Sequence, residues 1–176
     1  MKALIRVVIL CIVGLSCSVS AETLYGVKVS IGSGERSTDA YQVSLLSDYG
    51  QQLFQNRVAL YWEVGYSHWS SSKGPEKQVD AINVSPVFRY DFSTTERGCV
   101  PYVSYSVGLA YLSETRVADK NLGMHFQFDN KLDVGMRFGS GERHDLAIGV
   151  RHVSNAGLDS DNDGFDVVRA SYSYRF

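Results

Sequence analysis

The sequence predicts an all-β protein, an eight-stranded antiparallel transmembrane β-barrel of the outer-membrane type. Three observations lead to this fold class: an export signal, segments of about 10 residues in which apolar and polar side chains alternate, and an aromatic C-terminus. A tilted membrane strand needs a segment of that length. The chain ends with Tyr172, Tyr174 and Phe176 at alternate positions, an ending typical of outer-membrane barrel proteins.

The N-terminus has the layout of a secretory signal peptide. A positively charged start leads into an apolar run over residues 3–15, and small residues precede a cleavage point before Glu22. This run is shorter than the roughly 20 apolar residues of a membrane-spanning helix. We therefore expect a signal peptide at residues 1–21 and one barrel domain at residues 22–176.

The cysteines and the charge narrow the function classes. Cys17 raises the alternative of a lipid anchor, but Gly14 stands three residues before it, where a lipidation site usually has an aliphatic residue. Cleavage would leave Cys99 as the last thiol and rule out an intramolecular disulfide. The net charge of −2 argues against a nucleic-acid partner.

Each predicted strand carries apolar side chains at alternate positions and polar or small ones between them. The apolar faces of the first four strands are Tyr25, Val27, Val29 and Ile31; Tyr41, Val43 and Leu45; Val58, Leu60, Trp62, Val64 and Tyr66; and Ile82, Val84, Phe88 and Tyr90. Those of the last four are Val103, Tyr105, Val107, Leu109 and Tyr111; Phe126, Phe128, Leu132, Val134, Met136 and Phe138; Leu146, Ile148 and Val150; and Val168, Ala170, Tyr172 and Tyr174. A soluble β-sandwich is the alternative, and strand length with the terminal aromatics favours the barrel.

The polar faces predict a filled interior, because side chains just fill an eight-stranded barrel. The charged residues expected inside, where they can pair, are Lys28, Glu63, Arg89, Asp129, Lys131, Asp133, Arg137, Arg151, Arg169 and Arg175. An even strand number puts both termini in the periplasm. The exterior connections are then residues 33–38, 70–80, 113–121 and 155–165, and the periplasmic turns lie near Gln51, Thr94 and Gly141.

The last hairpin concentrates groups suited to ester hydrolysis. Alternate residues of a strand point the same way, so the outward face of the seventh strand continues to His152 and Ser154. The same count along the last strand places Asp166 on its outward face. A serine activated by an imidazole that a carboxylate orients is the arrangement of serine hydrolases. We predict Ser154 as the nucleophile, His152 as the base and Asp166 as the acid. Asn155 and the Gly157 amide are expected near the oxyanion.

A second His-x-Ser spacing occurs at His68-Trp69-Ser70, at the outer end of the third strand. No acid is expected at a matching outward position on an adjacent strand, so we interpret His68 as part of the interfacial aromatic belt. His125 and His144 stand alone at strand ends, and we expect belt or loop roles for them.

The segments His152-Val-Ser-Asn-Ala-Gly157 and Asn162-Asp-Gly164, followed by the acid at position 166, resemble the signature of the PagL lipid A 3-O-deacylase family. The resemblance includes the signal peptide and the strand layout, but is detailed only in the C-terminal hairpin. It implies an esterase without cofactor or metal that removes the 3-hydroxyacyl chain from the 3-position of lipid A in the outer leaflet of the outer membrane. By match, Ser154 is the nucleophile, His152 the base, Asn155 and Gly157 the oxyanion donors, and Asn162 and Gly164 loop-shaping residues.

One residue departs from the family pattern, and one loop raises the alternative of a calcium site. The acid of the family is typically glutamate, so the shorter Asp166 needs closer strand packing or a water to reach His152, and Asp163 is a spare carboxylate. The acidic loop at residues 159–164 mimics the start of an EF-hand, but Ala170 stands where the twelfth ligand would be glutamate. We therefore predict no metal site.

Other functions remain open at this point. A non-enzymatic barrel for adhesion or envelope stability would share everything except the hairpin constellation. An acyltransferase would need an acyl-chain cavity inside the barrel, and the charged lumen argues against one. Whether the protein forms a homodimer is left open by the sequence.

Overall fold

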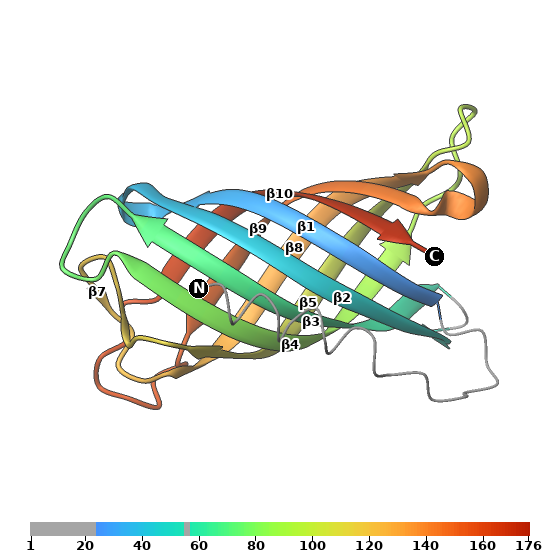
Figure 1. The fold of residues 1–176 in the computed structure, drawn as a ribbon. Coiled ribbons are helices and arrows are strands. Elements are labelled where there is room, and N and C mark those ends of the chain that lie inside the picture. The colour runs from blue at the N-terminus through green and yellow to red at the C-terminus, as the bar shows by residue number, and fades with distance from the viewer. Residues whose placement is uncertain (1–23, 55–56) are drawn as a thin grey trace.

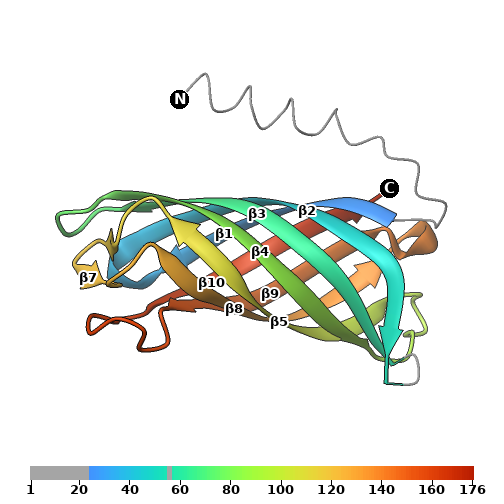
Figure 2. The ribbon, with the colours of Figure 1, turned by 90° about the horizontal axis from the view of Figure 1, so that it is seen from below.

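The computed structural model describes residues 24–54 and 57–176, and their long strands form one closed antiparallel barrel. The strands follow one another around the barrel in the order β1-β10-β9-β8-β5-β4-β3-β2 (Figures 1 and 2). Their bounds are β1 (Leu24–Gly34), β2 (Thr38–Leu53), β3 (Val58–Ser71), β4 (Gln78–Asp91), β5 (Val100–Leu112), β8 (Phe126–Phe138), β9 (His144–Ser154) and β10 (Phe165–Arg175). This architecture confirms the predicted eight-stranded barrel.

The two ends of the barrel carry the termini and the connections as predicted. β1 pairs with β10, so the chain starts and finishes at the same end, which carries η2 (Ser140–Glu142). The other end carries η1 (Glu35–Ser37) and the connections at residues 72–77, 113–125 and 155–164. We refer to it as the outer end. The predicted signal peptide lies outside the described residues, and no helix in the described part is long and apolar enough to cross a membrane.

The connection predicted near Gln51 comes a few residues later in the chain, between Leu53 and Val58. Gln51 lies inside β2, where it pairs with Leu60, and the strand continues to Leu53. A register shift between Ser47 and Gln51 explains the difference, because a bulge inserts residues into one strand without ending its pairing. The polar composition of this stretch gave the appearance of a turn.

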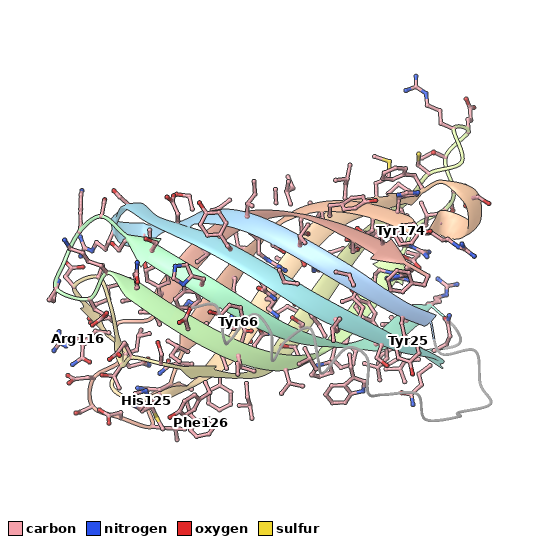
Figure 3. All side chains as sticks on the ribbon, in the orientation of Figure 1. Tyr25, Tyr66, Arg116, His125, Phe126 and Tyr174 are labelled. Carbon is pink, nitrogen blue, oxygen red and sulfur yellow. The ribbon has the colours of Figure 1, made fainter. Side chains whose placement is uncertain are left out.

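The outer wall is apolar, which confirms the predicted parity. Every barrel strand contributes large hydrophobic side chains that are exposed, such as Ile31, Ile82, Ile148 and Val168 at more than 60% of their area. Monomers in water rarely expose so much contiguous apolar surface, whereas lipid solvates it. Aromatic residues lie toward both ends of this wall, with Tyr25 and Tyr174 at one end and His125 and Phe126 at the other (Figure 3).

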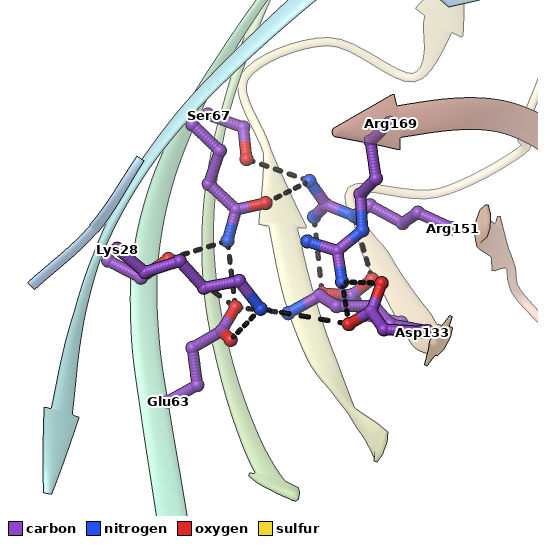
Figure 4. A network of polar contacts seen from close by, with 10 residues as sticks. Lys28, Glu63, Ser67, Asp133, Arg151 and Arg169 are labelled. Atoms are coloured by element: carbon purple, nitrogen blue, oxygen red, sulfur yellow. Dashed lines mark hydrogen bonds and ion pairs between the residues drawn. The ribbon is translucent and has the colours of Figure 1, made fainter. Parts of the chain in front are cut away.

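Paired charges fill the middle of the lumen (Figure 4). Glu63 lies between two lysines, with Lys28 Nζ 3.2 Å from Oε2 and Lys131 Nζ 2.9 Å from Oε1. Nearby, Arg151 binds Asp129 and Arg169 binds Asp133. Nine of the ten charged residues predicted inside are buried, and the tenth, Arg137, binds Asp91 and Glu142 near the rim. This packing confirms the filled lumen.

Toward its outer end, the lumen has an apolar core that the sequence did not reveal. It is covered by a ribbon of two short strands, β6 (Arg116–Val117) and β7 (Lys120–Asn121), at the end opposite the C-terminus (Figure 1). The buried members of this core are Ala40, Trp69, Val79, Ala81, Ala110, Leu112, Val117, Leu122, Val153, Phe165 and Val167. The rings of Trp69 and Phe165 lie 5.3 Å apart in it.

The β6–β7 ribbon connects the other outer loops. Its Ala118 bridges to Glu76 in the β3–β4 connection. Asp119 forms an ion pair with Arg36 of η1, with 3.0 Å between Oδ1 and Nε. On the other side, the backbone of Asn121 exchanges hydrogen bonds with Asp163 in the β9–β10 connection. The outer end is therefore one connected assembly, and the candidate site lies at its edge.

Candidate active site

The β9–β10 hairpin brings His152 and Asp166 into direct contact. They are cross-strand partners, and His152 Nδ1 lies 2.7 Å from Asp166 Oδ1. Their side chains are 46% and 65% exposed, so both lie on the outer wall. The shorter acid thus reaches the imidazole without a bridging group, because the two residues are directly opposite each other.

Ser154 lies two residues beyond His152 on the same face of β9. The burial of Arg151, Val153 and Asn155, which alternate with these two, fixes that outward direction. Among the hydrogen bonds of the described residues, none joins Ser154 Oγ to His152. Such bonds are often long in a free enzyme and shorten when substrate binds. The hairpin therefore brings all three predicted residues to one surface, with the acid–base contact already made.

Gly164 makes room for the imidazole. A Cβ at this position would lie 3.0 Å from His152 Cε1, and its φ of +63° favours glycine. The predicted loop-shaping residue Asn162 also has a defined contact, because its Oδ1 accepts a hydrogen bond of 2.9 Å from the backbone N–H of Asn155. Both residues shape the loop around the candidate triad.

Asn155 and Gly157 are the predicted oxyanion donors. In the structure, both donate hydrogen bonds to other groups of the protein. Asn155 is fully buried, and its Nδ2 donates to the carbonyl oxygens of Leu122 and Asp161 at 2.9 and 2.7 Å. The Gly157 N–H donates to Asn155 Oδ1 at 2.8 Å. The structure therefore gives Asn155 a structural role in the loop, and its oxyanion role stays a prediction.

Glu35 and Lys120 support the acid, and sequence reasoning missed both. Glu35 Oε2 accepts a hydrogen bond of 3.2 Å from the backbone N–H of Asp166, and the same oxygen binds Lys120 Nζ. Glu35 comes from the β1–β2 turn and Lys120 from the ribbon. No local pattern links such distant segments, so the sequence held no signal for them.

Two other acids of the loop, Asp161 and Asp163, contact the ribbon. Asp163 Oδ2 accepts a hydrogen bond of 2.6 Å from the Asn121 N–H, and Asp161 Oδ2 accepts one of the same length from the Asn121 side chain. Within residues 24–54 and 57–176, no three His, Cys, Asp or Glu side chains gather in a way that could hold a metal ion. Asp163 thus serves the loop and does not contact His152.

The expectation that His68 lacks an acid was wrong. Asp80 is its cross-strand partner on β4, and His68 Nδ1 lies 2.8 Å from Asp80 Oδ1. The register between β3 and β4 decides this pairing. That register could not be counted across the polar connection that joins the two strands. By contrast, His125 stacks on Tyr111 and His144 on Phe138, as expected for residues in an interfacial belt.

Comparison with known proteins identifies the family. The family model described as Lipid A 3-O-deacylase (PagL) matches residues 39–175, which include the whole β9–β10 hairpin. The chain belongs to the PagL family. This confirms the resemblance inferred from the hairpin residues and makes the protein an outer-membrane hydrolase.

Individual relatives agree with this family. Lipid A deacylase PagL of Pseudomonas aeruginosa is 31% identical over 172 residues, covering 94% of each chain. Lipid A deacylase PagL of Bordetella bronchiseptica is 34% identical over 160 residues, covering 86% of this chain and 83% of the relative. The crystal structure of the outer membrane enzyme PagL superposes with a TM-score of 0.74 at 29% identity, covering 85% of this chain and 98% of that one.

A further solved structure shares the fold alone. Neisserial surface protein A has a TM-score of 0.56 at 14% identity, covering 88% of this chain and 97% of that one. The barrel by itself therefore does not distinguish an enzyme from other small surface barrels, and the hairpin must carry the functional argument.

Proposed function

We propose that this protein is a lipid A 3-O-deacylase whose catalytic residues are Ser154, His152 and Asp166. The observation that carries the proposal is the 2.7 Å contact between His152 and Asp166 on the lipid-facing wall, with Ser154 two residues beyond His152 on the same face. A polar pair costs stability where lipid chains surround it, so a barrel without chemistry to perform has little reason to keep it there.

Each of the three groups has a role in the proposed reaction. Ser154 Oγ attacks the carbonyl carbon of the ester at the 3-position, while His152 Nε2 accepts the hydroxyl proton. Asp166 accepts the Nδ1–H and stabilises the imidazolium that forms. The proton then passes to the departing sugar oxygen, and water hydrolyses the acyl-enzyme by the same sequence of proton transfers.

The oxyanion requires donors beside Ser154. We assign them to Asn155 Nδ2 and the Gly157 N–H, which lie one and three residues after the nucleophile in the chain. For these donors to act, the oxyanion must replace hydrogen bonds that they now make within the loop. Removing one such donor typically slows an acyl transfer by roughly 10²–10³-fold.

The paired charges of the lumen argue against transfer of an acyl chain to another lipid. An acyltransferase of this size would hold the chain inside the barrel, where Glu63, Lys28 and Lys131 are already packed. The outer wall beside Ser154 is instead open to the surrounding lipid. Hydrolysis in the membrane plane fits this arrangement better.

Mass spectrometry of lipid A from expressing cells tests the proposal. We expect loss of one 3-hydroxyacyl chain with the wild type, and intact lipid A with Ser154→Ala or His152→Ala. Ser160→Ala is the matched control, because Ser160 is an exposed serine of the same loop. Unchanged lipid A with the wild type, when the barrel is shown to be folded in the outer membrane, would contradict the proposal.

A further inference from the structure

A second histidine–aspartate pair lies on the opposite wall of the barrel. His68 is on β3 and His152 on β9, and four strand-to-strand steps separate these strands in either direction around the barrel. Both histidines lie near the outer ends of strands that run outward. Each has an aspartate as cross-strand partner on the strand that follows.

The two pairs have the same atomic contact. Nδ1 of His68 lies 2.8 Å from Asp80 Oδ1, compared with 2.7 Å in the first pair. The side chains of His68 and Asp80 are 38% and 47% exposed, so this pair also lies on the outer wall. Tyr66 adds a hydrogen bond of 2.7 Å to the same carboxylate oxygen, which holds Asp80 in place.

A serine completes the likeness. Ser70 follows His68 by two residues on β3, and its neighbours Trp69 and Ser71 are buried, so Ser70 shares the outward face. Gln78 is its cross-strand partner on β4 and is also exposed. Directly opposite residues have Cβ atoms about 5 Å apart, so a primary amide lies within reach of an oxyanion formed at Ser70.

We propose that Ser70, His68 and Asp80 form a second ester-hydrolysing site, which acts on an ester-linked acyl chain of an outer-leaflet lipid. Ser70 Oγ forms a bond to the ester carbonyl carbon and gives its proton to His68 Nε2. The bond to the alcohol oxygen breaks, and that oxygen takes the proton. Water then cleaves the acyl-serine, which releases the fatty acid and restores the hydroxyl.

The surroundings favour a lipid with a polar headgroup. Outward apolar side chains such as Val64 and Ile82 continue toward the middle of the wall, where an acyl chain would lie. Beside Ser70, a polar hollow of about 460 Å³ opens at the outer rim. It is lined by Ser33, Ser37, Asp39, Ser70, Ser71 and Ser72. The clustered serine hydroxyl groups can form hydrogen bonds with a sugar headgroup.

Asp39 makes the second site slower than the first. It is the cross-strand partner of Ser70 on β2, and its negative charge opposes the oxyanion. The first site has no such acid, because Phe128 occupies the matching position beside Ser154. We therefore expect Asp39→Asn to raise the rate of the second site severalfold.

A fluorophosphonate probe distinguishes the two serines, because it reacts covalently with a serine that a histidine activates. The full-length barrel in detergent micelles is treated with the probe, and the modified peptide is identified by mass spectrometry. We expect labels on both Ser154 and Ser70 in the wild type, and on Ser70 alone in Ser154→Ala. Ser160→Ala should label like the wild type.

Hydrolysis and base removal complete the test. Ser154→Ala should keep a slow hydrolysis of a p-nitrophenyl acyl ester that Ser154→Ala/Ser70→Ala lacks. His68→Ala should slow labelling of Ser70 by roughly 10²-fold, the usual share of a general base, and leave Ser154 labelling unchanged. A label confined to Ser154 in a folded barrel would overturn the second site and leave the first intact. A label confined to Ser70 would instead support the second site and contradict the first.

Discussion

Replacing Asp166 with asparagine tests the acid of the proposed triad, and the structure sets the size of the expected loss. Asp166 uses one carboxylate oxygen for His152, and its other oxygen has no hydrogen-bond partner among the described residues. The side chain is 65% exposed. An asparagine amide can therefore rotate to present its oxygen to the imidazole, which keeps the hydrogen bond and loses only the charge.

The loss of the charge has a definite magnitude. Hydrogen bonds to charged groups contribute about 1.5–3 kcal/mol and neutral ones about 0.5–1.5 kcal/mol, a difference of roughly 1–1.5 kcal/mol. We expect Asp166→Asn to lower the rate about tenfold. Asp166→Ala removes the whole contact and should cost more, roughly 10- to 100-fold. A rigidly held asparagine would trap the wrong imidazole tautomer, at a cost of roughly 10⁴-fold.

The assay is release of 3-hydroxy fatty acid from lipid A in mixed micelles, with equal amounts of folded barrel. Asp163→Asn is the control, because its side-chain oxygen can still accept the hydrogen bond from the Asn121 backbone. It should stay active. If Asp163→Asn lost activity and both Asp166 variants kept it, the acid would have to be reassigned. A 10⁴-fold loss in Asp166→Asn would refute the rotation argument.

Three further predictions concern support and stability. Glu35→Ala should lower kcat severalfold with KM unchanged, because Glu35 contacts the Asp166 backbone; a change in KM alone would contradict a positioning role. Glu63→Gln leaves two buried lysines with less compensation, so the free energy of unfolding in vesicles should fall by about 3–5 kcal/mol, while activity per folded molecule stays constant. Ile148→Lys puts a charge on the lipid-facing wall and should lower the same free energy by roughly 2–4 kcal/mol; unchanged stability would mean that this face does not contact lipid.

The strands and their two faces were predictable because alternation is a local property. Parity counted along β9 and β10 was enough to place His152, Ser154 and Asp166 on one surface. The contact between His152 and Asp166 needed the hairpin register, and counting back from the C-terminus supplied an outward position on the correct strand. The bulge in β2 marks the limit, since polar residues there resemble a turn.

What the sequence did not reveal depends on contacts between distant segments. The β6–β7 ribbon has two residues in each strand, too few for any periodicity. Its partners Glu35, Asp163 and Glu76 come from three other connections. The prediction for His68 missed its partner Asp80 for a related reason, because the register across a loop is set by packing of the whole sheet.

The pairing of β1 with β10 has a consequence for when the candidate acid is held in place during barrel closure. Glu35 follows β1, and it holds the backbone of Asp166 at the start of β10. The loop after Ser154 is held by Asn121 of the ribbon between β5 and β8. The first of these supports forms only when the first and last strands join. A barrel in which β1 and β10 have not yet joined therefore lacks the contact by which Glu35 holds the backbone of Asp166.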